Sequence, residues 1–178
     1  MSFNFLSYME TLARQLVAVS HGVNDRKSFF RVSGISAMEE LFQGGLNKGS
    51  FPAVCAIDQP ESRLIDKQSS NLAMLNYYYF FVLQKADVAS ASSRSQAILE
   101  CMGIARSMLS QMFKDKESAF RDPSSLPTGL WNLNRDSVSF KAVGPLADNC
   151  YGVWVSFTVL NNADIKFNQQ DWIQNNGE

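Results

Sequence analysis

The side chains that could do chemistry are few and far apart in this chain of 178 residues. The only histidine is His21, beside Gly22 in a segment of turn-forming residues, and the sequence has no second histidine to share a metal ion. General-base catalysis also needs a group that orients the base, and no neighbour of His21 can be nominated for that role. We therefore expect His21 to be a solvated or capping residue and not a catalytic one.

The acidic residues after the first apolar strand segment could in principle form a carboxylate pair. Asp58, Glu61 and Asp66 are close in sequence, but Arg63 and Lys67 stand among them. Such mixed charge in a polar segment is typical of a solvated face, where ion pairs contribute little. We interpret these carboxylates as surface residues.

The cysteines indicate neither a disulfide framework nor a zinc site. Cys55, Cys101 and Cys150 are an odd number, they are widely spaced, and they include no CxxC pair, which favours a reducing compartment. Cys55 stands in the apolar segment AVCAI. Burial in such surroundings raises the pKa of a thiol and makes it a poor nucleophile.

Sequence motifs of the common enzyme classes are also missing. The chain contains no GxSxG, HExxH, GxxxxGK[ST] or GxGxxG motif, the usual signatures of hydrolases, metalloproteases and nucleotide-binding proteins. We therefore predict a protein that is not an enzyme and that uses no cofactor and no metal.

An aromatic run, LNYYYFFVLQKAD at residues 75–87, raises the question of a binding surface. In a strand, Tyr77, Tyr79 and Phe81 would face one side, and the residues between them, which are also large and apolar or aromatic, would face the other. RNA-binding sheets combine exposed aromatics with basic residues, and Lys85 is the only basic residue nearby. A strand that is apolar on both faces is usually covered on both. We therefore favour core packing plus a subunit contact through Tyr77, Tyr79 and Phe81 over a ligand or nucleic-acid platform.

The overall composition fits an ordinary folded domain without a nucleic-acid or membrane preference. Sixteen basic and seventeen acidic residues give a net charge of −1, without the basic excess of a duplex-binding protein. The longest nearly apolar run, residues 77–83, is far shorter than the roughly 20 residues of a membrane span. The first residues, MSFNFLSYMETLARQ, do not resemble a secretory signal. No membrane association is expected.

Hydrophobic periodicity predicts an α+β fold. Apolar residues at helical spacing indicate helices over residues 3–19 and 93–113, and the capping-box spacing Ser36 to Glu39 indicates a short helix between them. Strands are predicted at residues 51–58, 75–87, 136–143 and 150–160. We expect a single domain over residues 1–178: an antiparallel sheet of about four strands with two main helices packed on it, in the order helix-strand-strand-helix-strand-strand.

Two polar segments lie outside this predicted core. Residues 60–71 read as a long hairpin loop or β-arm in which Leu64 and Ile65 are the only apolar anchors. Folding such a segment onto its own domain gains little against backbone entropy, so we expect an arm that contacts a neighbouring subunit. Residues 161–178 form a polar C-terminal tail with Trp172 as its anchor.

Several segments together resemble a known class of proteins. They are FPAVCAID, YYYFFVLQKAD, AILECMGIARSMLSQM and VGPLADNCYGVWVSFTVLNN, followed by the late Trp172. Their combination resembles small structural proteins of tailed phages and prophages of Bacteroidetes-type hosts, and the order of elements is similar to tail-terminator and head–tail joining (neck) proteins. The resemblance covers roughly residues 3–172, and its most specific piece is GPLADNCYGVWVSF.

The resemblance implies a non-catalytic protein that assembles. Its members arrange a helix-covered antiparallel sheet in a ring, commonly a hexamer, at the neck or tail end of the virion, after assembly in the host cytoplasm. The implied partners are further copies of the chain, other neck or tail proteins, and DNA passing through the lumen of the ring.

Two functions of other classes stay open at this stage. One is a small-molecule-binding or enzymatic α+β domain with a pocket between sheet and helices, which would be a small oligomer with a defined cavity. The other is a regulatory or inhibitor module of the host. A ring component would instead present extended interface surface.

Overall fold

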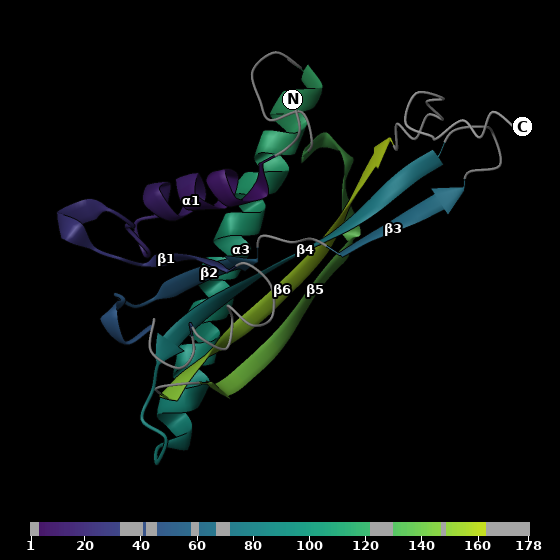
Figure 1. Ribbon diagram of the computed structural model, residues 1–178. Helices are drawn as coiled ribbons and strands as arrows, with labels where there is room; N and C mark the ends of the chain where they lie inside the picture. The colour runs from purple at the N-terminus through teal and green to yellow at the C-terminus, as the bar shows by residue number, and fades with distance from the viewer. Residues whose placement is uncertain are drawn as a thin grey trace, which may run out of the picture.

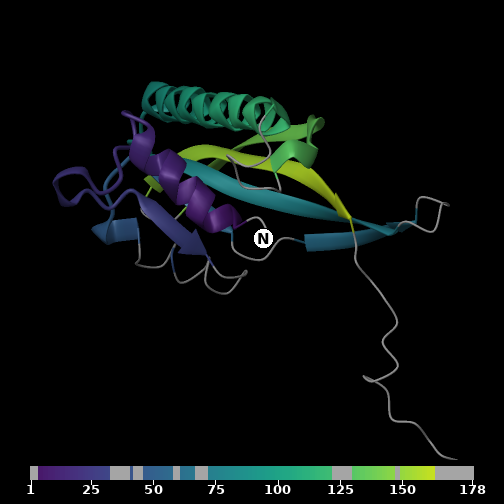
Figure 2. The same ribbon diagram turned by 90° about the horizontal axis from the view of Figure 1, so that it is seen from above.

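A computed structural model of the protein describes residues 4–32, 41, 46–57, 61–66, 72–121, 130–146 and 149–162. These residues form a six-stranded mixed sheet with two α-helices, α1 and α3, on one of its faces (Figures 1 and 2). The fold class is therefore α+β, as predicted. The helix expected from Ser36 and the tail anchor Trp172 lie outside the described residues.

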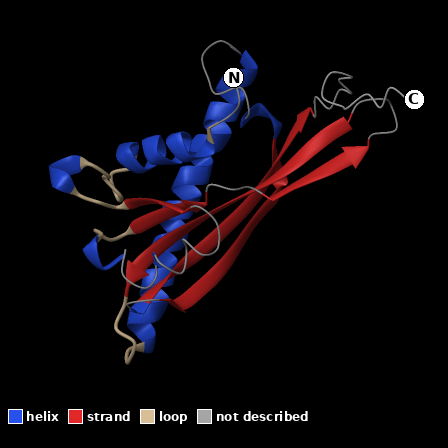
Figure 3. Ribbon diagram, viewed as in Figure 1, coloured by secondary structure: helices blue, strands red, loops and turns tan. Residues whose placement is uncertain are grey.

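The sheet is built around one long central pair of strands (Figure 3). Its order is β1, β2, β4, β6, β5, with β3 as an additional partner of β4. The strands are β1 (Phe29–Val32), β2 (Ala53–Ile57), β3 (Glu61–Asp66), β4 (Leu72–Lys85), β5 (Leu133–Leu146) and β6 (Cys150–Asn162).

Strand β4 organises the sheet because both of its edges are paired. One edge pairs with β6 along its length, from Ala73 opposite Asn162 to Lys85 opposite Cys150. The other edge is shared by two short strands, since β2 pairs with Phe80–Leu83 and β3 pairs with Leu72–Tyr77. The first half of β4 therefore forms a three-stranded ribbon with β3 and β6.

The predicted four-stranded antiparallel sheet is wrong in two respects. Strand β1 pairs with β2 in parallel, Phe29 beside Val54, so the sheet is mixed and not antiparallel. Parallel neighbours are joined by a crossover and not by a hairpin turn, so no local turn signal marks this pair. Residues 61–66 form strand β3, which was not among the four predicted strands and which agrees with the β-arm and not the loop alternative for residues 60–71; its charged residues are those of an edge strand, whose main chain pairs on one side only.

The helices agree with the periodicity but not in every boundary. Helix α1 spans Phe5–Gln15, and its first turn is capped by Asn4, whose Oδ1 accepts a hydrogen bond from the Ser7 amide at 3.0 Å. Helix α3 spans Ala91–Arg121, longer than the predicted 93–113. Its cap is Ser90, whose Oγ accepts from the Ser93 amide at 3.2 Å. Of the described helices, neither α1 nor α3 meets the length and hydropathy of a membrane span.

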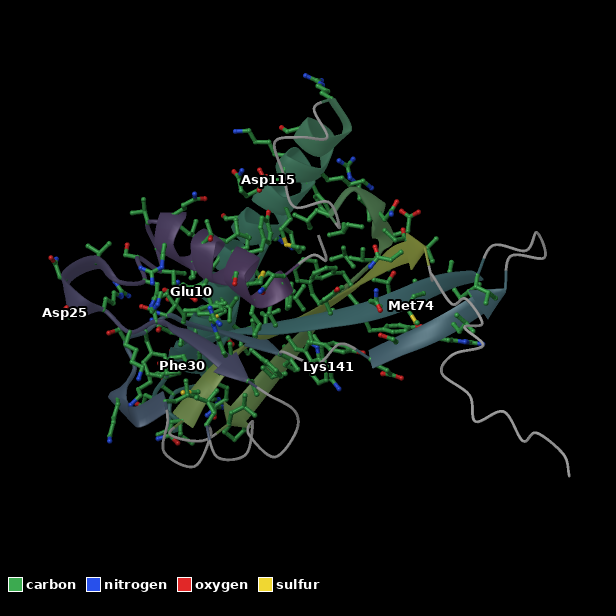
Figure 4. The ribbon with its side chains drawn as sticks, turned by 45° about the horizontal axis from the view of Figure 1, so that its top comes forward. Glu10, Asp25, Phe30, Met74, Asp115 and Lys141 are labelled. Atoms are coloured by element: carbon green, nitrogen blue, oxygen red, sulfur yellow. The ribbon has the colours of Figure 1, made fainter. Side chains whose placement is uncertain are left out.

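Both helices bury their apolar faces in one core above the sheet. The tyrosine hydroxyl of Tyr8 on α1 donates a 2.6 Å hydrogen bond to Asp115 on α3, which joins the two helices (Figure 4). The predicted stripe of α3 packs in this core, with Ile98 and Met102 half-buried and the other members buried: Cys101, Ala105, Met108, Leu109 and Met112. The helix stripe thus faces the sheet.

We expect Leu109→Ala to lower the free energy of unfolding by about 2–5 kcal/mol, because it removes a buried side chain and leaves a cavity. Met102→Ala should cost less, since Met102 is half-buried. The measurement is chemical denaturation. Leu99→Ala on the same helix is the matched control: Leu99 is 66% exposed, and its truncation should change stability by less than about 0.5 kcal/mol. Equal losses at positions 99 and 109 would contradict this packing.

A second, smaller core covers part of the opposite face of the sheet. It gathers Phe30 of β1, Cys55 of β2, Phe81 of β4 and Cys150 of β6, together with Leu46 from a short 3-10 helix, Leu46–Lys48. Both faces of the central strands are therefore covered at this end of the sheet. None of the described residues of β3, at the far end of the sheet, belongs to this second core.

Candidate functional site

One end of the sheet forms an extension, which we define as β3, residues 72–77 of β4 and residues 158–162 of β6. It projects beyond α1 and α3 (Figures 1 and 2), and Met74 marks its position in Figure 4. Leu64 and Ile65, the predicted apolar anchors, lie on opposite faces of β3: Leu64 is 46% exposed and Ile65 is half-buried. Among the described strands, β3 pairs only with β4.

The three aromatic residues predicted to form a subunit contact share one face of β4 but differ in surroundings. Tyr77 and Tyr79 are half-buried on the face away from the helices. Phe81 is 3% exposed in the second core of the same chain. The ring of Tyr79 lies 5.6 Å from that of Trp154, edge-on, and its hydroxyl is 3.4 Å from a Glu61 oxygen. Burial, and next the Glu61 carboxylate, raise the pKa of Tyr79.

A groove lies between α3 and the edge strand β5, with a volume of about 550 Å³. Leu109, Phe113, Val138 and Phe140 supply its apolar side chains, and the exposed Arg106 and Lys114 lie at its rim. Neither cation forms an ion pair with a described residue, whereas the Arg135 guanidinium pairs with Glu117 and lies 5.0 Å from the Phe113 ring. A pocket between sheet and helices was one of the alternatives left open by the sequence, but its lining was not predicted; the only sequence signal was the apolar pair Val138 and Phe140 among polar neighbours.

The strongest cluster of ionisable groups joins α1 to β1 (Figure 4). The Glu10 carboxylate binds Arg14 at 2.8 Å and Arg31 at 2.6 Å, and hydrogen bonds from these two guanidinium groups lower its pKa. His21 lies 4.0 Å from Glu10, and its Nδ1 accepts the Ser28 amide hydrogen at 3.2 Å. Burial first, and the Arg14 charge second, lower the pKa of His21. The cluster contains no nucleophile among these residues and is best explained as a link between two elements.

His21 is therefore less solvated than the sequence suggested, because its side chain is only 14% exposed. Its acceptor role toward Ser28 requires an unprotonated Nδ1. This contact fixes the turn that follows α1 against the start of β1.

The other candidate chemical groups have no site around them. Cys55, Cys101 and Cys150 are buried, and none of the three forms a disulfide. Burial is the main cause that raises the pKa of Cys55, and it raises that of Cys101 to about 12, so both thiols stay protonated. Glu61 is exposed, and Asp58 lies outside the described residues. Within the described part of the chain, no group of three His, Cys, Asp or Glu residues is placed to hold a metal.

The described residues thus define an α+β protein with a helix-covered sheet, whose most prominent binding features are edge strands, an extension and one groove. A scan of the chain against protein-family models gives no match, and a search among curated proteins gives none either.

Proposed function

We propose that the protein is a structural component of a phage or phage-like particle, of the tail-terminator or head–tail joining type. It acts by self-association into a ring and by docking to other neck or tail proteins. In this proposal the protein is not an enzyme, is assembled in the host cytoplasm and ends in the tail or neck of the virion.

The observation that carries the proposal is found in the edge strands β3 and β5, which with β1 are the three described strands that pair on one side only. Each pairs with only one described strand, so each has an edge whose main-chain groups can pair with another chain. Strands β3 and β5 also each expose one large apolar side chain, Leu64 at 46% and Phe140 at 37%. Two different adhesive edges on one chain favour head-to-tail association, which produces rings when the rotation closes.

The proposal is tested by the mass and shape of the purified protein. Light scattering should give a mass that is an integral multiple of 19.9 kDa, six times that value for a hexamer. Negative-stain micrographs should show closed rings of uniform size. A protein that stays monomeric over a wide range of concentration would contradict the proposal.

The groove between α3 and β5 favours a second candidate, a small-molecule-binding protein. Its volume of about 550 Å³ is within the range of ligand pockets, and it combines apolar side chains with the cations Arg106 and Lys114. An amphipathic anion would suit this lining. Saturable binding of such a compound to a monomeric protein, lost in Phe140→Asp, would favour this candidate over the ring.

A further inference from the structure

Leu64 and Phe140 are the only large apolar side chains of the described strands that are exposed, and they lie on different edges of the sheet. Both project toward the helix-covered side. Leu64 is opposite Met74, and Met74 lies on the same face of β4 as Tyr78 and Phe80, which are buried under the helices. Phe140 is opposite Val155, which is also in the helix-covered core. If β3 of another copy pairs with β5 so that its helix side and that of β5 face the same way, Leu64 lies on the groove side of the sheet.

The free edge of β5 has the right length for a short added strand. Its pairing with β6 is regular from Ser139 to Val143 and shifts in register on either side of this stretch. Strand β3, Glu61–Asp66, has six residues in unbroken register with β4. The two regular segments are therefore similar in length, and each has one edge with no described partner strand.

The groove beside β5 offers an apolar contact at the same place. Val138 and Phe140 of β5 form one wall, and Leu109 and Phe113 of α3 supply the other. A leucine side chain that enters from an adjacent strand would be removed from water together with the exposed part of Phe140. Insertion of Leu64 into the groove would thus bury both exposed side chains, Leu64 and Phe140, in one contact.

The charges of the two edges are complementary. Strand β3 carries two acidic residues and one basic residue, Glu61, Asp66 and Arg63. Strand β5 and the groove rim carry an excess of basic residues: Arg106, Lys114, Arg135 and Lys141 against Glu117 and Asp136. Such complementarity steers two surfaces together and disfavours wrong pairings.

Pairing of β3 with β3 of another copy is less favourable. An antiparallel pairing over all six residues places Glu61 opposite Asp66 at both ends, and like charges directly opposite each other destabilise a sheet. It would also leave the apolar groove beside β5 empty. The third edge strand, β1, exposes no large apolar side chain, so the more favourable partner for β3 is the free edge of β5.

We propose that β3 of one copy adds to the free edge of β5 in the next copy, with Leu64 seated in the groove between α3 and β5. This inference rests on the proposed self-assembly and names its interface. The contact is heterologous, so every added copy presents a new free β5 or β3, and closure of the series gives a ring.

The test uses thiol cross-linking between copies of the full chain. Leu64→Cys and Phe140→Cys are purified separately, mixed under assembly conditions and treated with a short bis-maleimide. The native cysteines are buried, so the introduced thiols are the accessible ones. A covalent dimer should form in the mixture and in neither variant alone. Leu64→Cys mixed with Leu99→Cys is the matched control, since Leu99 is exposed on α3 but does not line the groove, and it should give no dimer.

Two charge variants complete the test. Leu64→Asp and Phe140→Asp should each reduce the wild-type mass to that of one chain while thermal unfolding stays cooperative, because both side chains are exposed in the single chain and the variants lose only the stabilisation that assembly adds. Leu99→Asp should keep the wild-type mass. If the wild type is oligomeric but Leu64→Asp keeps the full mass, or if Leu64→Cys cross-links to itself, the interface is wrong and the ring proposal stands. If the wild type is a monomer, both proposals are wrong.

Discussion

Replacing Gly152 by alanine should destabilise the protein by about 3 kcal/mol or more, the upper end of the cost of overpacking. A Cβ atom at this position would lie 1.9 Å from the Val82 carbonyl oxygen of the neighbouring strand. That oxygen belongs to the main chain of β4, which is paired on both edges, so it cannot move without breaking the centre of the sheet. The expected result is an unfolded or barely folded protein.

Gly103→Ala provides a control with the same chemical change. Gly103 lies within α3, is exposed, and an added Cβ would meet no atom within 4 Å. Because glycine is a poor helix former, this substitution should stabilise the protein by about 0.5–1 kcal/mol. Urea denaturation of both variants should therefore give changes of opposite sign. A Gly152→Ala protein as stable as wild type would mean that β4 and β6 are spaced differently at this point.

The elements with a long regular pattern were predictable from the sequence. The apolar stripe of α3 repeats over several turns, so its inward face followed from the spacing alone. The pair β5 and β6 could be predicted because the alternating segments flank the turn-forming residues GPLADN, and the two strands pair antiparallel. These elements could therefore be predicted from local sequence patterns alone.

Two strands of the sheet were absent from the predicted four, each for a different reason. Strand β1, Phe29–Val32, has only four residues, too few for a period to show, and its partner β2 begins at Ala53. Strand β3 lies at an edge of the sheet, where charged residues are tolerated because one side of the strand faces away from the sheet. Its polar composition therefore left a hairpin loop and a β-arm as alternative predictions.

The candidate site was predictable only in part. Alternation correctly placed Tyr77, Tyr79 and Phe81 on one face of β4, since this requires only a strand. It could not distinguish Phe81, which is covered by the second core, from the two tyrosines, which lie toward the extension. The sequence left open a pocket between sheet and helices but could not give its lining, because the walls of the groove come from α3 and β5 and meet only in the folded protein.

Removing β3 and residues 72–77 of β4 from the extension should abolish assembly and leave a folded monomer. The geometry of the sheet fixes how this variant is made. A tight turn in place of residues 60–71 alone could not join β2 to Leu72. Strand β2 ends beside Phe80, and Leu72 lies eight positions before Phe80 on β4, about 26 Å away at the rise of a strand. Continuing the register of Ala56 opposite Phe80 instead places Asp58 opposite Tyr78. Residues 59–77 are therefore replaced by Asn-Gly, the preferred two-residue hairpin turn.

The shortened protein should fold because the deleted segment contributes little to either core. Among residues 61–65 and 72–77, whose burial is described, Ala73 is the buried one, and both hydrophobic clusters consist of described residues outside the deletion. The deletion removes β3 and with it Leu64, the strand and side chain proposed to bind the next copy. Light scattering should give the mass of one chain, and thermal unfolding followed by circular dichroism should remain cooperative. Outright unfolding would place the extension in the structural core, and an unchanged oligomeric mass would place the subunit interface elsewhere on the protein.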